Sequence, residues 1–181
     1  MMTRSKSVGE STRTEQIPSD SLSLNWLSGK ERELVLDYFY ERFGVPREIF
    51  DDYGIYERNR GIWVLRKSKW VSLLKTLPFD TAGLMILRRL DRGVKPTTIA
   101  FQLFGKWIKR NVVKLSEKEF FELIGKKSLR LTEEKSSCLS RGYVAVRVNE
   151  FVAGCAFYKE NQLVSQFPKN FSSVITTEIS D

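Results

Sequence analysis

Apolar and polar positions alternate most regularly near the C-terminal end of the chain. Over residues 143–148, Val144, Val146 and Val148 are interleaved with Tyr143, Ala145 and Arg147, a period of two that predicts a half-buried strand. The following run, 151–158, is apolar on both faces and predicts a buried central strand. Turns at Asn149-Glu150 and Glu160-Asn161 join these strands to a third. Residues 141–169 are therefore predicted to form a small closed sheet.

A helix is predicted near the start of the ordered chain. Ser28-Gly29-Lys30-Glu31 matches a capping box, so the helix should begin at about Lys30. It should end at Phe43, because Gly44 and Pro46 follow. Acidic side chains repeat every four residues along it and form one exposed ridge, made of Glu33, Asp37 and Glu41.

Short elements are predicted next. A helical turn over 47–50 precedes a hairpin of 53–58 and 62–67, closed by Asn59-Arg60-Gly61. A short helix should run from Trp70 to Leu77 and end at Pro78. The pattern then predicts a strand over 83–90 and a turn over 92–95.

The remaining elements are a helix, two strands and a second capped helix. Thr97 or Thr98 should cap a helix that continues to Ile108, with an apolar stripe of Ala100, Leu103, Phe104 and Trp107. A strand over 111–115 leads to a capping box at 116–119 and a helix to about Ile124. A strand over 128–131 and a polar loop over 132–140 complete the chain before the meander.

These elements predict an α+β protein with two ordered units. The N-terminal α/β unit covers residues 23–80, and a mixed α/β barrel covers residues 81–170. Residues 1–22 and 171–181 are rich in Ser, Thr and charge, so we expect both to be flexible tails.

Composition restricts the cellular setting. The 181 residues are 41% hydrophobic, enough for a real core, but no apolar run approaches the roughly 18 residues of a membrane span. The N-terminus has no apolar region typical of a signal peptide. Only Cys138 and Cys155 are present, which makes a disulfide framework unexpected. We therefore expect a cytoplasmic protein without a membrane partner.

The residue inventory argues against catalysis. The chain contains no histidine, which removes the commonest general base near neutral pH and the commonest metal ligand. Two cysteines alone cannot complete a zinc site, and no phosphate-binding glycine loop or nucleophile motif occurs. The sequence predicts a protein that is not an enzyme and has no metal or cofactor.

Positive charge is concentrated in the middle of the chain. The formal net charge is +8, yet the segment from Arg58 to Lys114 has 14 Lys and Arg against only Asp80 and Asp91. The rest of the chain has 16 basic and 20 acidic residues. A polyanion should therefore meet one region of the protein. The alternative reading is an ordinary solvated surface.

The order of elements resembles a known family. The landmarks are AGL at 82–84, LSEKE at 115–119, LRL at 129–131, the glycines at 142 and 154, and PK at 168–169. With these, residues 34–169 resemble the C-terminal PUA-like region of Sun-family RNA 5-methylcytosine methyltransferases. They are also similar to the pre-PUA and PUA pair of ribosome-biogenesis factors. The resemblance implies that 23–80 is a pre-PUA-like unit and 81–170 a PUA-like RNA-binding domain.

The chain lacks the catalytic half of that family. Cys138 follows Ser137 and Cys155 follows Gly154, whereas the family's catalytic cysteines stand in Pro-Cys and Thr-Cys contexts. Ala156 also stands where a second glycine is common in PUA meanders. The resemblance therefore implies an RNA-recognition module without chemistry of its own.

Lys and Arg are the side chains that contact phosphates, and such contacts position an RNA without reading its sequence. We expect one positive surface composed of Arg88, Arg89, Arg92, Lys95, Lys106, Lys109, Arg110, Lys114, Arg141, Arg147 and Lys169. Because Arg88 and Arg89 are adjacent in a strand, their side chains should point to opposite faces, and one of them should be an ordinary surface charge or ion-pair partner. Lys106, Lys109 and Arg110 also fit the wet side of an amphipathic helix. Aromatics among these cations, such as Trp63, Trp70 and Trp107, are more often core than stacking platforms.

Three functions fit this pattern. The first is non-catalytic binding of structured rRNA or tRNA in RNA modification or ribosome biogenesis. The second is RNA recognition in trans for a separate cytosine-5 methyltransferase catalytic subunit, which should then co-purify. The third is a protein–protein scaffold on a ribosomal particle that uses the acidic ridge. Charge reversal of Arg89, Lys106 and Lys109 would leave that scaffold intact.

Overall fold

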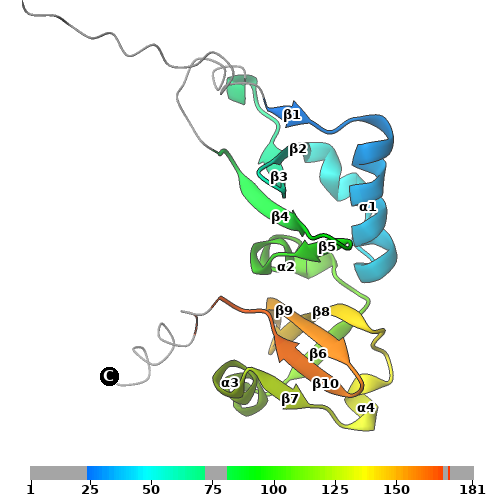
Figure 1. The fold of residues 1–181 in the computed structure, drawn as a ribbon, viewed down its shortest axis with the longest axis vertical. Helices are drawn as coiled ribbons and strands as arrows, with labels where there is room; N and C mark the ends of the chain where they lie inside the picture. Colours follow the sequence, from blue (N-terminus) through cyan, green and yellow to red (C-terminus); the bar gives the residue numbers. More distant parts are fainter. Residues whose placement is uncertain (1–23, 72–80, 169–170, 172–181) are drawn as a thin grey trace, which may run out of the picture.

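The structure, a computed structural model, describes residues 24–71, 81–168 and 171. Within these residues the chain forms two five-stranded sheets, each with helices packed against it. Figure 1 shows the sheets one above the other, with α2 (Thr98–Phe104) between them. The predicted α+β class is confirmed.

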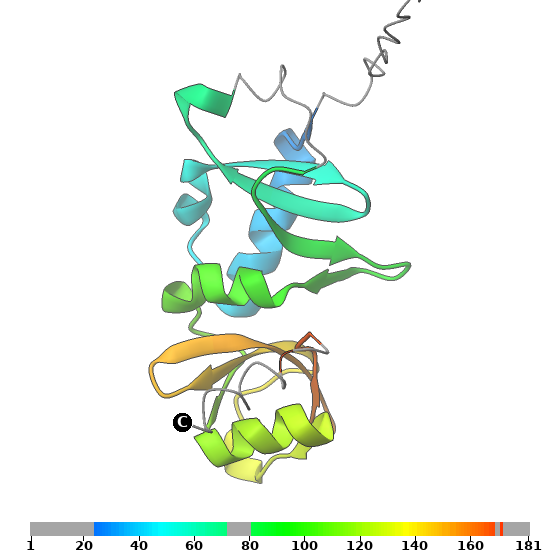
Figure 2. The same cartoon turned by 90° about the vertical axis from the view of Figure 1, so that its left-hand side faces the viewer.

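The first sheet is antiparallel throughout and has the strand order β1-β2-β3-β4-β5. Its strands are β1 (Asn25–Trp26), β2 (Tyr53–Arg58), β3 (Gly61–Arg66), β4 (Leu84–Arg89) and β5 (Val94–Pro96). Helix α1 (Gly29–Phe43) covers one face of this sheet in Figure 1, and Figure 2 looks onto the opposite face.

Helix α1 has the predicted end, but Ser28 at its N-cap makes no side-chain cap hydrogen bond, so the capping box predicted there does not form. Gly44 adopts the left-handed conformation, with φ 72°, and its N–H bonds back to the carbonyls of Phe39 and Tyr40. The helix buries Val35, Leu36, Phe39 and Phe43. The predicted helical turn follows as η2 (Arg47–Asp52), whose Phe50 packs against Phe39.

Helix α2 begins where predicted but ends earlier. Of the two candidate caps, Thr97 accepts the bond from Ala100 N–H. The chain tightens into the 3₁₀ turn η4 (Gly105–Trp107), and Trp107, like Leu103, is only partly buried against the core. The buried residues are consequently Ala100, Phe101 and Phe104.

The core of the first sheet continues into the second. Phe101 meets Phe43 edge-on, and Phe104 packs against Phe39 and Phe50. The same apolar cluster includes Ala145, Val152 and Cys155 of the second sheet. Helix α2 is thus shared by both sheets.

The second sheet has the order β6-β8-β9-β10-β7. Its strands are β6 (Val112–Leu115), β7 (Ser128–Arg130), β8 (Gly142–Val148), β9 (Phe151–Lys159) and β10 (Gln162–Ser165). β6 and β8 are parallel, and the other pairs are antiparallel. The three-stranded meander is confirmed. The sheet curls against α3 (Glu117–Lys126), but β6 and β7 remain edges among the described residues, so the expected closed sheet is not found.

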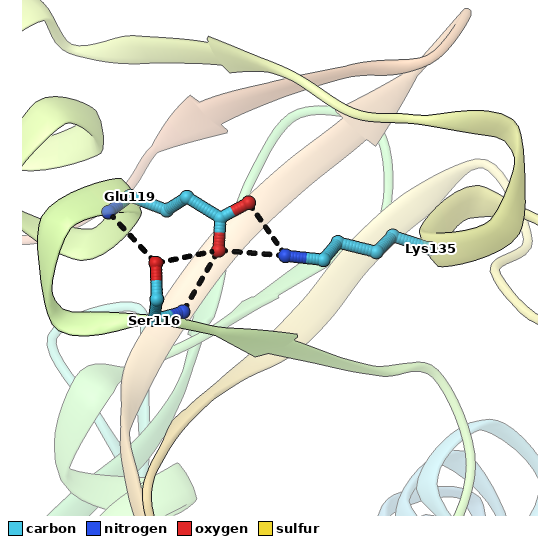
Figure 3. A network of polar contacts seen from close by, with 3 residues as sticks. All are labelled: Ser116, Glu119 and Lys135. Carbon is cyan, nitrogen blue, oxygen red and sulfur yellow. Dashed lines mark hydrogen bonds and ion pairs between the residues drawn. The ribbon is translucent and has the colours of Figure 1, made fainter.

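A polar network holds the start of α3, as Figure 3 shows. Ser116 Oγ accepts from Glu119 N–H, and the Glu119 carboxylate accepts from Ser116 N–H, which confirms the predicted capping box. Lys135 Nζ donates to both Glu119 carboxylate oxygens at 2.5 and 2.6 Å. Burial alone would raise the pKa of Glu119, but the bonds from Lys135 and Ser116 outweigh burial and lower it. Lys135 lies in α4 (Glu133–Ser136), a short helix within the predicted loop.

The structure corrects several boundaries. β4 and β5 belong to the first sheet, so the division between sheets lies after α2, not at residue 81. Residues 94 and 95, predicted as part of a turn, lie in β5. Strand β1 was not predicted. Of the predicted 70–77 helix only Trp70 and Val71 are described. Residues 72–77 and Lys169 lie outside the described residues, and so do both predicted tails apart from Phe171.

Candidate nucleic-acid interface

The predicted cations do not form one continuous surface. Arg88, Arg89 and Arg92 lie at the β4–β5 hairpin, before the first turn of α2, whereas Lys106, Lys109 and Arg110 follow its last turn. Figure 2 shows the hairpin tip and the connection after α2 on opposite sides of the molecule. The sequence did not indicate this separation, because α2 with its 3₁₀ extension is only ten residues long and the two groups are therefore close together along the chain.

Two hairpin tips lie side by side at one end of the first sheet. Asn59 and Arg60 both have positive φ, 50° and 59°, as a two-residue hairpin turn requires. Arg89 N–H donates to the Arg60 carbonyl at 2.7 Å, and Arg60 Nη2 meets Asp91 Oδ1 at 2.6 Å. These bonds hold the β2–β3 tip against the β4–β5 tip.

The cations on these two tips are arginines. We call the group the arginine tip; its members are Arg58, Arg60, Arg88, Arg89 and Arg92. Two acidic residues, Glu57 and Asp91, lie among them. A hollow of about 360 Å³ opens there, lined by Asn59, Arg60, Arg88, Arg89, Leu90 and Asp91. A planar guanidinium can donate two parallel hydrogen bonds to two oxygens of one phosphate. A surface rich in arginine is therefore suited to bind a polyanion.

Arg88 and Arg89 point to opposite faces of the sheet, as predicted. Arg89 lies on the α1 side and bonds Glu57 through two nitrogens, at 2.5 and 2.9 Å. These bonds raise the pKa of Arg89 above its usual value. Arg88 is exposed on the other face, and neither it nor Arg92 takes part in an ion pair among the described residues. Arg89 is therefore the ion-pair partner of the two.

Other predicted cations hold the two sheets together. Arg147 Nη2 donates to the carbonyls of Gly105 and Ile108 at 3.4 and 3.3 Å. Lys95 Nζ donates to Gln166 Oε1 at 2.6 Å. Arg110 Nη1 donates to the Glu41 carbonyl, and its guanidinium lies over the Tyr40 ring. We assign these three side chains a structural role.

Arg42, which the sequence analysis did not single out, is the main donor where the two sheets meet, a region we call the junction. Its guanidinium donates to the carbonyls of Tyr143, Ser140 and Arg141, at 2.8, 3.1 and 3.2 Å. Burial lowers the pKa of Arg42, and burial also raises the pKa of the neighbouring Cys155 thiol to about 12. Gly142 makes room for this arginine, because a Cβ there would lie 2.7 Å from Nη2.

The last predicted cations are exposed but dispersed. Lys106 lies over the Trp107 ring, with Nζ 4.0 Å from its centroid. Lys109 follows η4, Lys114 lies on the edge strand β6, and Arg141 precedes β8. None of them joins the arginine tip.

Sequence reasoning missed Arg58 and Arg60 as site residues. The signal was present, since the basic segment begins at Arg58 and the turn was placed at Asn59-Arg60-Gly61. What the sequence did not show is that this turn lies against the β4–β5 tip.

The fold and these positions define an α+β protein of two sheets with an arginine-rich edge. Residues 2–72 match the model of a family described as a family of unknown function (DUF7122). This match ends shortly after β3 and does not reach the second sheet. No curated protein matches the chain. No helix in the part of the chain that the structure describes is long and apolar enough to cross a membrane.

Proposed function

We propose that this protein binds structured RNA through the arginine tip and performs no chemistry of its own. The observation that carries the proposal is the gathering of five arginines on two adjoining hairpin tips with only Glu57 and Asp91 among them. Such a surface attracts a phosphate backbone and releases its counterions.

On this proposal four of the five arginines contact the ligand. Arg89 is held by Glu57 in a paired bond on the α1 side of the sheet. The ion pair of Arg60 with Asp91 leaves the two side chains 67% and 92% exposed, so it contributes little and exchanges readily for a phosphate. Arg58, Arg60, Arg88 and Arg92 are the proposed phosphate contacts.

The resemblance supplies the identity of the polyanion. We propose that the second sheet is PUA-like, as a strand–helix–strand unit followed by a three-stranded meander with one parallel pair supports. On this proposal the ligand is rRNA or tRNA, and the process is RNA modification or ribosome biogenesis. The tip lies on the first sheet, so the RNA contacts of this chain extend beyond its PUA-like part.

Fluorescence anisotropy with total tRNA and structured rRNA fragments tests the proposal. The triple variant Arg60→Gln, Arg88→Gln, Arg92→Gln should bind at least 30-fold more weakly at low salt. The matched control is Lys118→Gln, Lys127→Gln, Arg130→Gln, which removes the same charge from exposed positions around α3 and β7. It should change affinity no more than threefold, the effect of net charge alone.

Two results would contradict the proposal. One is the absence of binding to any structured RNA at low salt. The other is an equal loss of affinity in both triple variants, because the tip would then act only through its share of the net charge.

A further inference from the structure

The strand register places cations and aromatics in neighbouring rows on one face of the first sheet. Arg58 pairs with Gly61, Gly61 with Arg88, and Arg88 with Lys95. Residues directly opposite one another in an antiparallel pair project from the same face. These residues therefore form a cross-strand row that contains Arg58 and Arg88 of the arginine tip.

The adjacent row is aromatic. Trp26 pairs with Tyr56, Tyr56 with Trp63, and Trp63 with Met85. The Trp26 and Tyr56 rings meet edge-on at 5.6 Å, and the Tyr56 and Trp63 rings are stacked, with 16° between their planes. We call Trp26, Tyr56 and Trp63 the aromatic row. It lies on the face opposite α1, toward the viewer in Figure 2.

Glycines let the two tryptophans lie against the backbone. A Cβ on Gly54 would lie 2.3 Å from the Trp26 ring, and one on Gly61 would lie 2.6 Å from Trp63 Nε1. Trp63 Nε1 also donates to the Arg58 carbonyl at 3.3 Å, which fixes this ring next to the arginine tip. Trp26 is 42% exposed and Trp63 is half-buried, whereas Tyr56 is buried beneath them.

We propose that the aromatic row stacks unpaired nucleotides of an RNA whose neighbouring duplex phosphates lie on the arginine tip. This inference rests on the proposed function and adds the ligand class, a junction of duplex and single strand. Charge and continuity identify the occupant. Arg58 and Arg88 border the row on the same face, so a base on Trp63 has its own phosphate within reach of a guanidinium.

Stacking on the aromatic row would complement phosphate binding by the neighbouring row of cations. Every base has a π-face, so an aromatic ring binds unpaired nucleotides of any sequence, while a duplex hides its bases from the protein. A blunt duplex can use only the tip. A duplex with a single-stranded extension can use the tip and the aromatic row together.

The test compares two RNA hairpins, one blunt and one with a five-nucleotide 3′ extension, binding to the full chain. The extension should tighten binding about tenfold. Trp26→Ala and Trp63→Leu should each remove most of that gain and leave blunt-hairpin affinity unchanged. Trp70→Ala is the matched control, because Trp70 is 63% exposed but lies outside the row, and it should keep the gain.

Tryptophan fluorescence supplies a second readout that does not depend on how well Trp63→Leu folds. Binding of the extended hairpin should quench emission in the wild type more strongly than in Trp26→Ala. An extension that adds no affinity, while the blunt hairpin still binds through the tip, overturns this inference and leaves the proposed function standing. Equal acrylamide quenching of the free wild type and free Trp26→Ala also overturns it, because the row would then be covered by another part of the chain or by a partner protein.

Discussion

Two groups of arginines in this molecule act differently. At the junction between the sheets, Arg42 of α1 donates to the Tyr143 carbonyl of β8, and Arg147 of β8 donates to the carbonyls of Gly105 and Ile108. At the arginine tip, Arg88 and Arg92 extend into solvent with no ion pair among the described residues. The two groups differ in their hydrogen-bond acceptors: guanidinium groups at the junction donate to backbone carbonyls, whereas those of Arg88 and Arg92 are exposed to solvent.

The comparison shows why a charge count alone overestimates a binding surface. A guanidinium that satisfies buried carbonyls adds to the formal charge of the chain but offers few donors to a ligand. Three of the predicted RNA contacts, Lys95, Arg110 and Arg147, likewise donate to oxygens of the protein itself. Variants that affect one region and spare the other test the distinction.

The largest effect on stability is expected at Arg42. The Arg42→Met variant leaves the carbonyls of Tyr143, Ser140 and Arg141 without this donor. The free energy of unfolding should fall by about 2 kcal/mol. Urea denaturation measures the loss, and RNA affinity per folded molecule should stay within twofold. A stability within 0.5 kcal/mol of the wild type, roughly the effect of an ordinary surface change, would contradict the assignment.

A somewhat smaller loss is expected for Gly142→Ala. Gly142 has φ 124°, and its new Cβ would press on Arg42 Nη2. The free energy of unfolding should fall by about 1.5 kcal/mol. Gly125→Ala is the control, since a Cβ in that α3 position meets nothing within 4 Å and should be neutral or stabilising. Equal stability of the two variants would contradict the close packing at Arg42.

Within the tip, Arg88→Gln and Arg89→Gln should differ. Arg88 is exposed and available, whereas Arg89 is already bonded to Glu57 on the other face. Arg88→Gln should weaken RNA binding about fivefold, and Arg89→Gln less than twofold, by anisotropy. The reverse order would place the RNA on the α1 side of the sheet.

The smallest effect concerns acid. The pKa of Glu119 is lowered in the folded state, so its contribution to stability is present above the unfolded value of about 4.3 and is lost as pH falls through the folded pKa. The network is partly exposed, so the contribution should be below about 1 kcal/mol. Urea midpoints at pH 7 and pH 3 should differ less for Glu119→Gln than for the wild type. An identical pH dependence of the two proteins would contradict a stabilising contribution from the ionised Glu119 carboxylate.

Local signals predicted most elements of the fold. The capping box at Ser116, the left-handed end at Gly44 and the turn at Asn59-Arg60 depend on residues within four positions of one another. The interactions that form such caps and turns involve only a few neighbouring residues. The helices and strands that they delimit were accordingly located to within a few residues.

Long-range pairing was not predictable in the same way. The β3–β4 pairing joins Gly61 to Arg88 across 27 positions, and no local pattern states which sheet a strand enters. The placement of Arg58 and Arg60 in the tip depends on that pairing. The junction role of Arg147 depends on α2 lying between the sheets, so periodicity showed only that its strand is half-buried.

The salt dependence of RNA affinity tests the central claim most directly. Dissociation constants for a structured tRNA between 50 and 300 mM KCl should give the wild type a log–log slope of about −3.6, from four neutralised phosphates. The Arg60→Gln, Arg88→Gln, Arg92→Gln variant should have a slope of about −1, while the Lys118→Gln, Lys127→Gln, Arg130→Gln variant keeps the wild-type slope. Equal slopes in the two variants would contradict the assignment of RNA binding to the arginine tip.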